Sequence, residues 1–346
     1  MPDPPPLANS PIPAPAAPVG QPSTPEERNL NRVIPFATLT PQNCAVLAER
    51  SEGALPILGM GKAARVLRNR FTSALDRLRG IAARGRWGAS PDELQLDAQA
   101  VATATDFFQI ADVMPLKISD RIGRELAQAL EGKLERNRTS RAADEFLSQF
   151  WVGLIIARGG ISPGVPPIQE RPTPDYVVKF DTLECGVEVK RPESLHSAPD
   201  AMDRAAAQLR DYRMPDSPNR RLPGFIALDL TDALFTPAMA VRYIEHPGLL
   251  HAVLRPQFNA FSTQLEHRME TYTRSDKYEG IIGLALFARL HIWEVDDLNQ
   301  PKGSYLFSVT RFEKACSGLV VEQATNLRRI FMTGAADVAG GQIRRL

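Results

Sequence analysis

The feature that most constrains the fold of this chain is the stretch from Pro174 to Lys190, which reads PDYVVKFDTLECGVEVK. The run 176–180 is rich in β-branched and aromatic residues, and a second β-rich run follows at 183–190 after a short segment that can turn the chain. Two such runs predict a β-hairpin. Successive side chains of a strand alternate faces. One face of the second strand therefore suits a core, and the other carries the Glu188 carboxylate and the Lys190 ammonium group.

The same hairpin brings a second carboxylate to these two groups. Asp175 begins the first strand, so antiparallel pairing places it near Glu188 and Lys190 at one strand edge. Carboxylate oxygens are the ligands of hard divalent cations such as Mg²⁺. Such a cation polarises a phosphoryl oxygen and lowers the pKa of a bound water. A lysine beside it can orient that water and offset charge in the transition state.

This arrangement resembles the PD-(D/E)xK nuclease superfamily, with Pro174-Asp175 and Glu188-Val189-Lys190 standing for its two core motifs. The resemblance implies that Asp175, Glu188 and the Val189 carbonyl bind Mg²⁺, with Mn²⁺ as an alternative, and that Lys190 positions the attacking water. It implies DNA more often than RNA as the substrate, and roles in restriction, phage defence or DNA repair. The competing interpretation is an ordinary hairpin with a solvated Glu and Lys on its outer face.

A helix expected before the hairpin supplies a further acid. Residues 139–158 have the hydrophobic periodicity of an amphipathic helix, with Glu145 at the edge of the apolar face. Members of the superfamily carry a glutamate on the helix before the sheet, and it completes the metal site. The resemblance therefore adds Glu145 to the expected site. The alternative is a plain surface glutamate.

A helix expected after the hairpin supplies an amide. Ser197 followed by Asp200 indicates a helix start. Gln208 and Tyr212 lie four residues apart on this helix and share a face. They match the QxxxY motif of RecB-like nucleases, which places Gln208 near the active site, and we expect Tyr212 among the nucleic-acid contacts. The alternative is a helix that packs its Tyr and exposes its Gln.

A local concentration of basic residues precedes these motifs. Between Gly59 and Gly88 there are eight Lys and Arg residues against one acid, a local charge of 8 − 1 = +7 in a chain of net charge +1. A basic face on an amphipathic helix suits phosphate contact. We expect nucleic-acid contacts from Arg65, Arg68, Arg77 and Arg79. Alternatively, this face is solvated and pairs with acids elsewhere, such as those of 92–106.

The order of these elements predicts an α/β (or α+β) protein. The resemblance implies a restriction endonuclease-like mixed sheet flanked by helices, in a nuclease domain at 137–346. Ten of the 29 prolines fall within the first 25 residues, so we expect a disordered arm at 1–33. Residues 34–136 are predicted to form a helical module, with DNA contact, oligomerisation and binding of a partner protein left open. Further strands are expected at 225–230, 280–295 and 305–312, and further helices at 237–246, 250–272 and from 318 onward.

The composition of the chain limits which cofactors and cellular compartments we expect for it. Its three cysteines are far apart, which excludes a four-cysteine iron–sulfur cluster and fits a reducing cytoplasm. No apolar run reaches membrane-spanning length, and we expect neither a signal peptide nor membrane association. The sequence thus predicts a cytoplasmic, Mg²⁺-dependent deoxyribonuclease. The alternatives are a non-catalytic nucleic-acid-binding or assembly protein on the same fold, and an unrelated interaction protein whose hairpin matches by chance.

Overall fold

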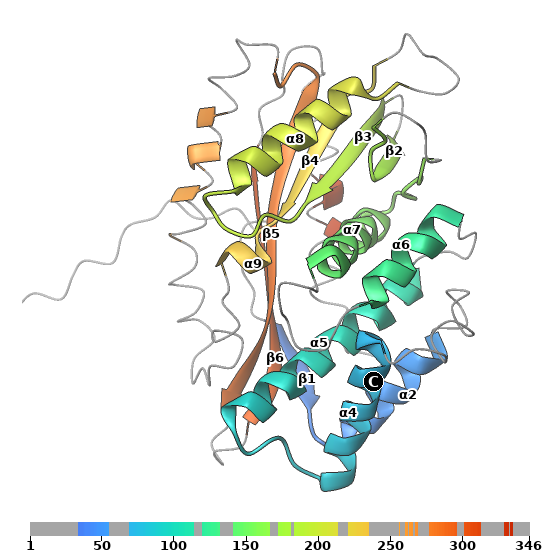
Figure 1. Ribbon diagram of the computed structural model, residues 1–346, viewed down its shortest axis with the longest axis vertical. Helices are drawn as coiled ribbons and strands as arrows, with labels where there is room; N and C mark the ends of the chain where they lie inside the picture. The colour runs from blue at the N-terminus through green and yellow to red at the C-terminus, as the bar shows by residue number, and fades with distance from the viewer. Residues whose placement is uncertain are drawn as a thin grey trace, which may run out of the picture.

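A six-stranded mixed sheet forms the centre of the protein, with strand order β1-β6-β5-β4-β3-β2 (Figure 1). The computed structural model describes residues 34–54, 69–113, 120–131, 141–166, 172–180, 183–213, 221–234, 277–295 and 301–312, and isolated helical positions within 256–268 and 329–334. The strands are β1 (Ile34–Leu39), β2 (Tyr176–Phe180), β3 (Leu183–Lys190), β4 (Gly224–Asp229), β5 (Ile281–Val295) and β6 (Pro301–Phe312).

The middle of the sheet is parallel and its margins are antiparallel. β3 pairs parallel with β4, and β4 pairs parallel with β5, whereas the β2–β3, β5–β6 and β1–β6 pairs are antiparallel. Parallel neighbours need a crossover connection, and α8 (Ala198–Asp211) lies in the crossover between β3 and β4. A parallel strand covered on both faces is hydrophobic throughout. β4 shows this, because all six of its residues are buried.

Helices cover both faces of the sheet and produce two cores. α8 packs on one face with Ile226, Leu228 and Leu284. On the other face, α7 (Arg141–Arg158) packs through Trp151, Ile155 and their neighbours on the odd-numbered side chains of β3. Figure 1 shows α8 and α7 on opposite sides of β3 and β4. The alternation of faces expected for β3 is therefore confirmed.

Four more helices pack around α7: α2 (Asn43–Ala54), α4 (Arg70–Arg84), α5 (Pro91–Val113) and α6 (Asp120–Leu130). α4 begins at Asn69, whose side chain accepts a hydrogen bond from Thr72 N in a capping box, and ends at Gly85 in the left-handed conformation (φ 63°). The Phe71 ring meets Phe107 of α5 edge to face at 5.2 Å. These helices share one core with α7 and the sheet.

Most of the expected elements are present, and the α/β class is confirmed. The expected hairpin, the helix at 139–158 and the strand at 225–230 lie within a few residues of the observed ones, and the predicted module at 34–136 contains the helices α2, α4, α5 and α6. The prediction of a helical region from residue 34 was wrong at its start, because 34–39 forms β1 and pairs with β6. The run 280–295 forms one strand, β5, rather than two.

Some predictions fall outside the described residues. The arm at 1–33 and the helix at 237–246 lie there, as does most of the segments 250–272 and 318–346. The described positions between 256 and 268 are helical, in agreement with the predicted helix. No described helix is both long and apolar enough to cross a membrane.

Candidate functional site

The register of the β2–β3 hairpin decides how the motif residues meet. Tyr176 pairs with Val187, so the preceding Asp175 lies opposite Glu188. The Val189 main-chain N–H donates to Asp175 Oδ2 at 2.8 Å. The main-chain N–H of Asp175 hydrogen-bonds the Glu188 carboxylate in return. The register of the hairpin thus brings Asp175 and Glu188 to adjacent positions on the two strands.

Lys190 and Gln208 complete the contacts of Glu188. Lys190 Nζ lies 2.5 Å from Glu188 Oε1, and Gln208 Nε2 donates to Glu188 Oε2 at 2.9 Å. The same Gln208 amide donates to the Thr173 carbonyl at 2.8 Å, which anchors the residues before Asp175. Gln208 therefore joins α8 to β3 and to the segment that precedes β2.

Two glycines allow α8 to lie this close to the sheet. A methyl group at Gly186 would lie 3.0 Å from Leu209 Cδ2, and one at Gly224 would lie 2.9 Å from Leu209 Cδ1. A larger residue at either position would require the Leu209 side chain to shift. The two glycines thus allow Leu209, next to Gln208, to pack tightly on the sheet.

Glu145 and Tyr212 differ in how they relate to the site. The Glu145 carboxylate on α7 is half-buried and contributes to raising the pKa of Lys190, so it shares the electrostatic environment of the site. Tyr212 caps the C-terminal end of α8 and is buried. Its packing follows the alternative of a buried tyrosine rather than that of a surface contact to nucleic acid.

The structure adds Arg121 and Glu125 of α6, which sequence reasoning missed. The Arg121 guanidinium donates to the Glu125 carboxylate at 2.7 Å and to the carbonyls of Pro166 and Pro174 at 3.0 and 3.2 Å. Its Nη2 lies 3.8 Å from Asp175 Oδ1. The only available sequence signal was the (i, i+4) Arg–Glu pair, which indicates helix stabilisation and not a site.

Burial controls the charges of this site. Glu188 is fully buried and Asp175 is 7% exposed. Burial raises the pKa of Asp175 to about 6, against the opposing effects of Lys190, the Val189 N–H and Arg121. Burial, together with the Asp175 charge, raises the pKa of Glu188 well above its ordinary value. Burial disfavours the charged form of Lys190, but Glu188 and Asp175 outweigh it and raise the pKa of this lysine.

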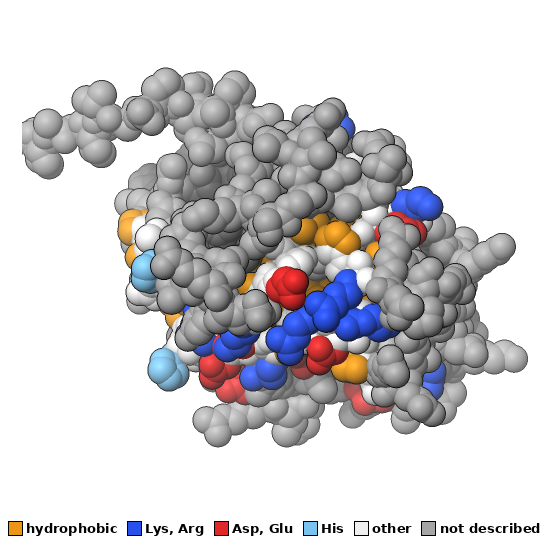
Figure 2. Space-filling view, turned by 90° about the horizontal axis from the view of Figure 1, so that it is seen from above, with side chains coloured by type: hydrophobic (Ala, Val, Ile, Leu, Met, Phe, Trp, Pro, Cys, Tyr) orange, Lys and Arg blue, Asp and Glu red, His pale blue; other side chains and the backbone are white. Residues whose placement is uncertain are grey.

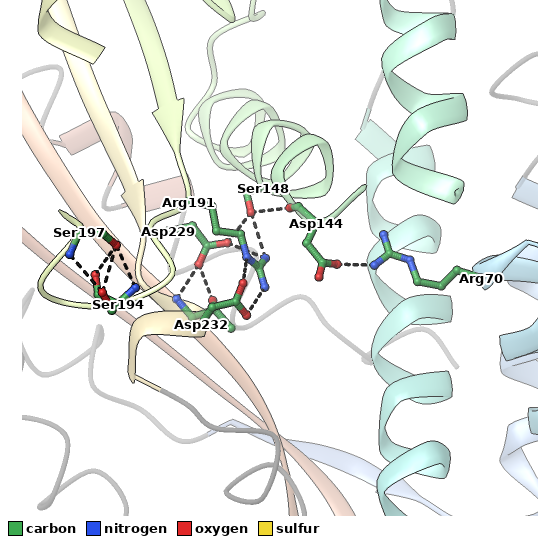
Figure 3. Close-up of polar contacts among 9 residues, drawn as sticks. Arg70, Asp144, Ser148, Arg191, Ser194, Ser197, Asp229 and Asp232 are labelled. Atoms are coloured by element: carbon green, nitrogen blue, oxygen red, sulfur yellow. Dashed lines mark hydrogen bonds and ion pairs between the residues drawn. The ribbon is translucent and has the colours of Figure 1, made fainter. Parts of the chain in front are cut away.

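A second polar cluster supports the end of β3 from the opposite face of the sheet. The Arg191 side chain is 2% exposed; it binds Asp232 through Nε and Nη2 at 2.7 Å each, and its Nη1 lies 3.2 Å from Asp229 Oδ2. Asp229 also accepts from the main-chain N–H of Thr231 in the short helix α9 (Thr231–Leu234). Figure 3 shows Arg191 between these acids. Asp229 thus caps the start of α9.

The same cluster reaches the N-terminal helices through α7. Arg191 Nη1 donates to the Ser148 hydroxyl at 3.1 Å. One turn earlier on α7, Asp144 forms a buried ion pair with Arg70 of α4. Arg70 also donates to the Ala129 carbonyl at 2.6 Å. Figure 3 shows Asp144 directed toward Arg70, away from Arg191. A chain of buried polar contacts therefore runs from α4 to the end of β3.

Two carboxylates and one main-chain carbonyl are the oxygen donors available to a metal. Among the described residues no group of three or more His, Cys, Asp or Glu side chains is arranged to hold an ion. The donors are nevertheless of the kind that Mg²⁺ prefers. A divalent cation would also offset the burial that raises the pKa of both Asp175 and Glu188. The carboxylates of Asp175 and Glu188 are therefore the side-chain oxygens that could hold such an ion here.

The expected basic face of α4 is largely paired within the protein. Arg77 Nε donates to the buried Asp97 at 2.6 Å, and Arg79 binds Glu52 at 2.5 Å. Arg65 and Arg68 lie outside the described residues. The pairing of Arg77 with Asp97 agrees with the alternative that this face meets acids of 92–106.

A different set of arginines gathers where α8 ends and β4 begins. Arg210, Arg213 and Arg221 lie there with two acids, since Arg210 pairs with Asp211 and Arg221 with Glu279, each at 3.3 Å. Figure 2 looks at this end of the molecule and shows Lys and Arg side chains clustered on the face, next to a few acids. Arg210 lies on α8 two residues after Gln208, and Arg213 and Arg221 follow the end of this helix in the sequence.

Comparison of the chain with protein-family models, curated proteins and solved structures finds no match.

Proposed function

We propose that this protein is a metal-dependent nuclease that hydrolyses DNA phosphodiester bonds, on a restriction endonuclease-like fold. The observation that carries the proposal is the hairpin register, which sets Asp175 opposite Glu188 with Lys190 and Gln208 in contact. The helix–strand–strand–helix order around this site and the mixed sheet support it. Bound Mg²⁺ would polarise the scissile phosphoryl group and supply a water of lowered pKa.

Each residue of the site has a role that its contacts support. Asp175 and Glu188 provide negative oxygens at adjacent strand positions. Lys190 keeps its proton, because the carboxylates raise its pKa, and so it acts as a cation that orients a water and offsets charge on a phosphoryl oxygen. Gln208 fixes Glu188 and the chain at Thr173, which keeps the hairpin and α8 in register.

One observation favours the alternative of a non-catalytic nucleic-acid-binding or assembly protein. Lys190 already neutralises Glu188, and Arg121 lies beside Asp175, so the carboxylates are compensated without an ion. In this second candidate the same four groups form a buried ion-pair cluster that only stabilises the hairpin. The two functions differ in whether a divalent cation binds.

Cleavage and metal binding measured on the same variants test the proposal. The full chain should nick supercoiled plasmid DNA with Mg²⁺ and not in excess chelator. Glu188→Gln should abolish both Mg²⁺ binding in calorimetry and nicking, because it removes a charged oxygen ligand. Lys190→Ala should retain Mg²⁺ binding and lose about 10² to 10³ in rate, the usual cost of one charge-stabilising group.

Matched controls come from the same hairpin. Glu184 lies on the same face of β3 as Glu188, and its carboxylate is 3.8 Å from Lys179 on β2. Glu184→Gln and Lys179→Ala should leave metal binding and nicking unchanged. Nicking that persists in chelator, or that survives in Glu188→Gln, would exclude the proposed mechanism. Absence of both nicking and metal binding in the folded wild type would favour the non-catalytic alternative.

A further inference from the structure

Arg121 is buried, yet one of its nitrogens makes no hydrogen bond. Its Nε binds Glu125 and its Nη1 binds the carbonyls of Pro166 and Pro174. Nη2 has no hydrogen-bond partner among the described residues, and its only charged neighbour there, Asp175 Oδ1, is 3.8 Å away. That distance is too long for a hydrogen bond. The guanidinium is therefore anchored on one side and has donors to spare on the side of the candidate site.

Because Arg121 is already anchored, it would lose little side-chain entropy on binding a ligand. An arginine side chain carries about 2 kcal/mol of rotamer entropy, which a flexible surface arginine loses when it binds. Arg121 has already lost it, because three acceptors fix its orientation. A fixed planar guanidinium with free N–H groups is well suited to a phosphate oxygen.

A phosphodiester needs cations at this site, because the site already contains several acids. A phosphodiester that approaches Asp175 and Glu188 meets two carboxylates, with Glu125 close to Arg121 as a third acid. Lys190 is already in contact with Glu188. Arg121 is the second cation that the described structure places beside these carboxylates, and it comes from α6 rather than from the hairpin.

We propose that Arg121 is a substrate-binding residue of this site, whose Nη2 binds a phosphate oxygen of DNA next to Asp175. The inference rests on the proposed function, because it uses the same site, and it adds the N-terminal helices to the binding surface. The competing explanation is a purely structural clamp, in which Arg121 only fixes the chain at Pro174.

The salt dependence of DNA binding separates the two explanations. Affinity of the full-length protein for a labelled random-sequence DNA duplex is measured by fluorescence anisotropy in Ca²⁺, from about 50 to 200 mM salt. Arg121→Met keeps an apolar stem but removes the charge, and it should lower the log–log slope by about one unit. Arg121→Lys restores a charge without the planar fork, so it should recover the slope while its melting temperature stays below that of the wild type.

If Arg121 were only a structural clamp, Arg121→Met and Arg121→Lys would both lower the melting temperature, and both would keep the wild-type salt slope of DNA binding. Arg124→Met is the matched control, since Arg124 lies on the same helix and is exposed. An equal loss of slope in Arg124→Met would show a general charge effect and would overturn the inference. The assay needs no cleavage. A wild type that nicks DNA together with an unchanged slope in Arg121→Met would therefore refute this inference and leave the nuclease proposal intact.

Discussion

The Glu188 carboxylate is not exposed to solvent, so its charged form has to be stabilised by neighbouring groups. Taking a charge out of water costs several kcal/mol unless hydrogen bonds and an opposite charge replace the water. Lys190, Gln208 and the main-chain N–H of Asp175 provide these contacts. α8 covers Glu188, and Gln208 of the helix contacts its carboxylate. Changes at this residue therefore affect both stability and activity.

Asp175→Asn should stabilise the metal-free protein at neutral pH. The folded state holds the Asp175 proton more tightly than the unfolded chain, since burial raises this pKa from 3.8 to about 6. Stability of the wild type should therefore fall as the pH rises from about 4 to about 6, by up to about 3 kcal/mol. Asparagine does not titrate. In thermal melts with chelator, the variant should therefore have a higher melting temperature than the wild type at pH 8, and this difference should disappear below pH 4.

Asp175→Asn also tests whether Asp175 is a metal ligand. Mg²⁺ at 100 times its Kd should raise the stability of the wild type by about 2.7 kcal/mol and leave Asp175→Asn unchanged. An Asp175→Asn protein that gains as much stability from Mg²⁺ as the wild type would remove this residue from the ligand set.

Two cysteines should resist modification in the native protein. Cys44 and Cys185 are fully buried, and burial raises the pKa of each thiol to about 12. Since the thiolate is the reactive form, neither should react with a disulfide reagent at pH 8 before the protein unfolds. Mass spectrometry of the labelled protein would identify the sites. Rapid labelling of Cys185 in the folded state would contradict the burial of β3.

At the scale of elements, α7 connects the hairpin to the N-terminal helices. Its Asp144 binds Arg70, and its Ser148 contacts Arg191 directly after Lys190. Arg70→Met should cost about 3–5 kcal/mol in denaturant unfolding, because it removes one partner of the buried ion pair with Asp144. Combining it with Asp144→Leu should recover much of that loss. The exposed Arg79–Glu52 pair is the control, and Arg79→Met should cost at most about 1 kcal/mol.

The C-terminal end of α8 should matter more for DNA affinity than the paired face of α4. Replacing Arg210, Arg213 and Arg221 together by Gln should weaken duplex binding and lower its salt slope, since they supply positive charge where α8 ends and β4 begins. Replacing Arg77 and Arg79 by Gln should change the slope less, because Asp97 and Glu52 already pair with them. If replacing Arg77 and Arg79 lowered the slope more, the sequence-based prediction that these two residues contact nucleic acid would be favoured instead.

Elements with local signals could be predicted, and long-range partners could not. Alternation in 183–190 and the motif order were enough to place Asp175, Glu188, Lys190 and Gln208 together. β1 was missed because its strand character depends on pairing with β6, at the far end of the chain. Arg121 was missed for the same reason, since its acceptors at Pro166 and Pro174 belong to a distant segment. A sequence pattern contains no information on such contacts.

At the scale of the whole molecule, the helical region and the sheet are not separate bodies. One core contains residues of α2, α4, α5 and α7 together with Val187, Ala227 and Phe287 of the sheet. Mutations in the N-terminal helices should therefore lower the stability of the site as well. This core includes helices from both sides of the predicted boundary at 136.

Deletions near the N-terminus should reveal where the folded part begins. Removing residues 1–33 should leave the melting temperature and nicking nearly unchanged, because their Pro-rich composition does not favour packed contacts. Removing residues 1–40 also deletes β1 and the buried Leu39, and should lower the melting temperature clearly. Equal melting temperatures for the two deletions would mean that β1 contributes no stability.

The pairing of β1 with β6 also sets an order of events during synthesis. Ribosomes add about 5–20 residues per second, so β1 leaves the ribosome on the order of 15 s or more before β6 is made. Until then the edge of β1 has no native partner, and an unpaired strand edge is a site of aggregation. Nascent chains that stop before β6 should therefore bind chaperones more strongly than full-length chains, and shortening them further to remove β1 should reduce that binding.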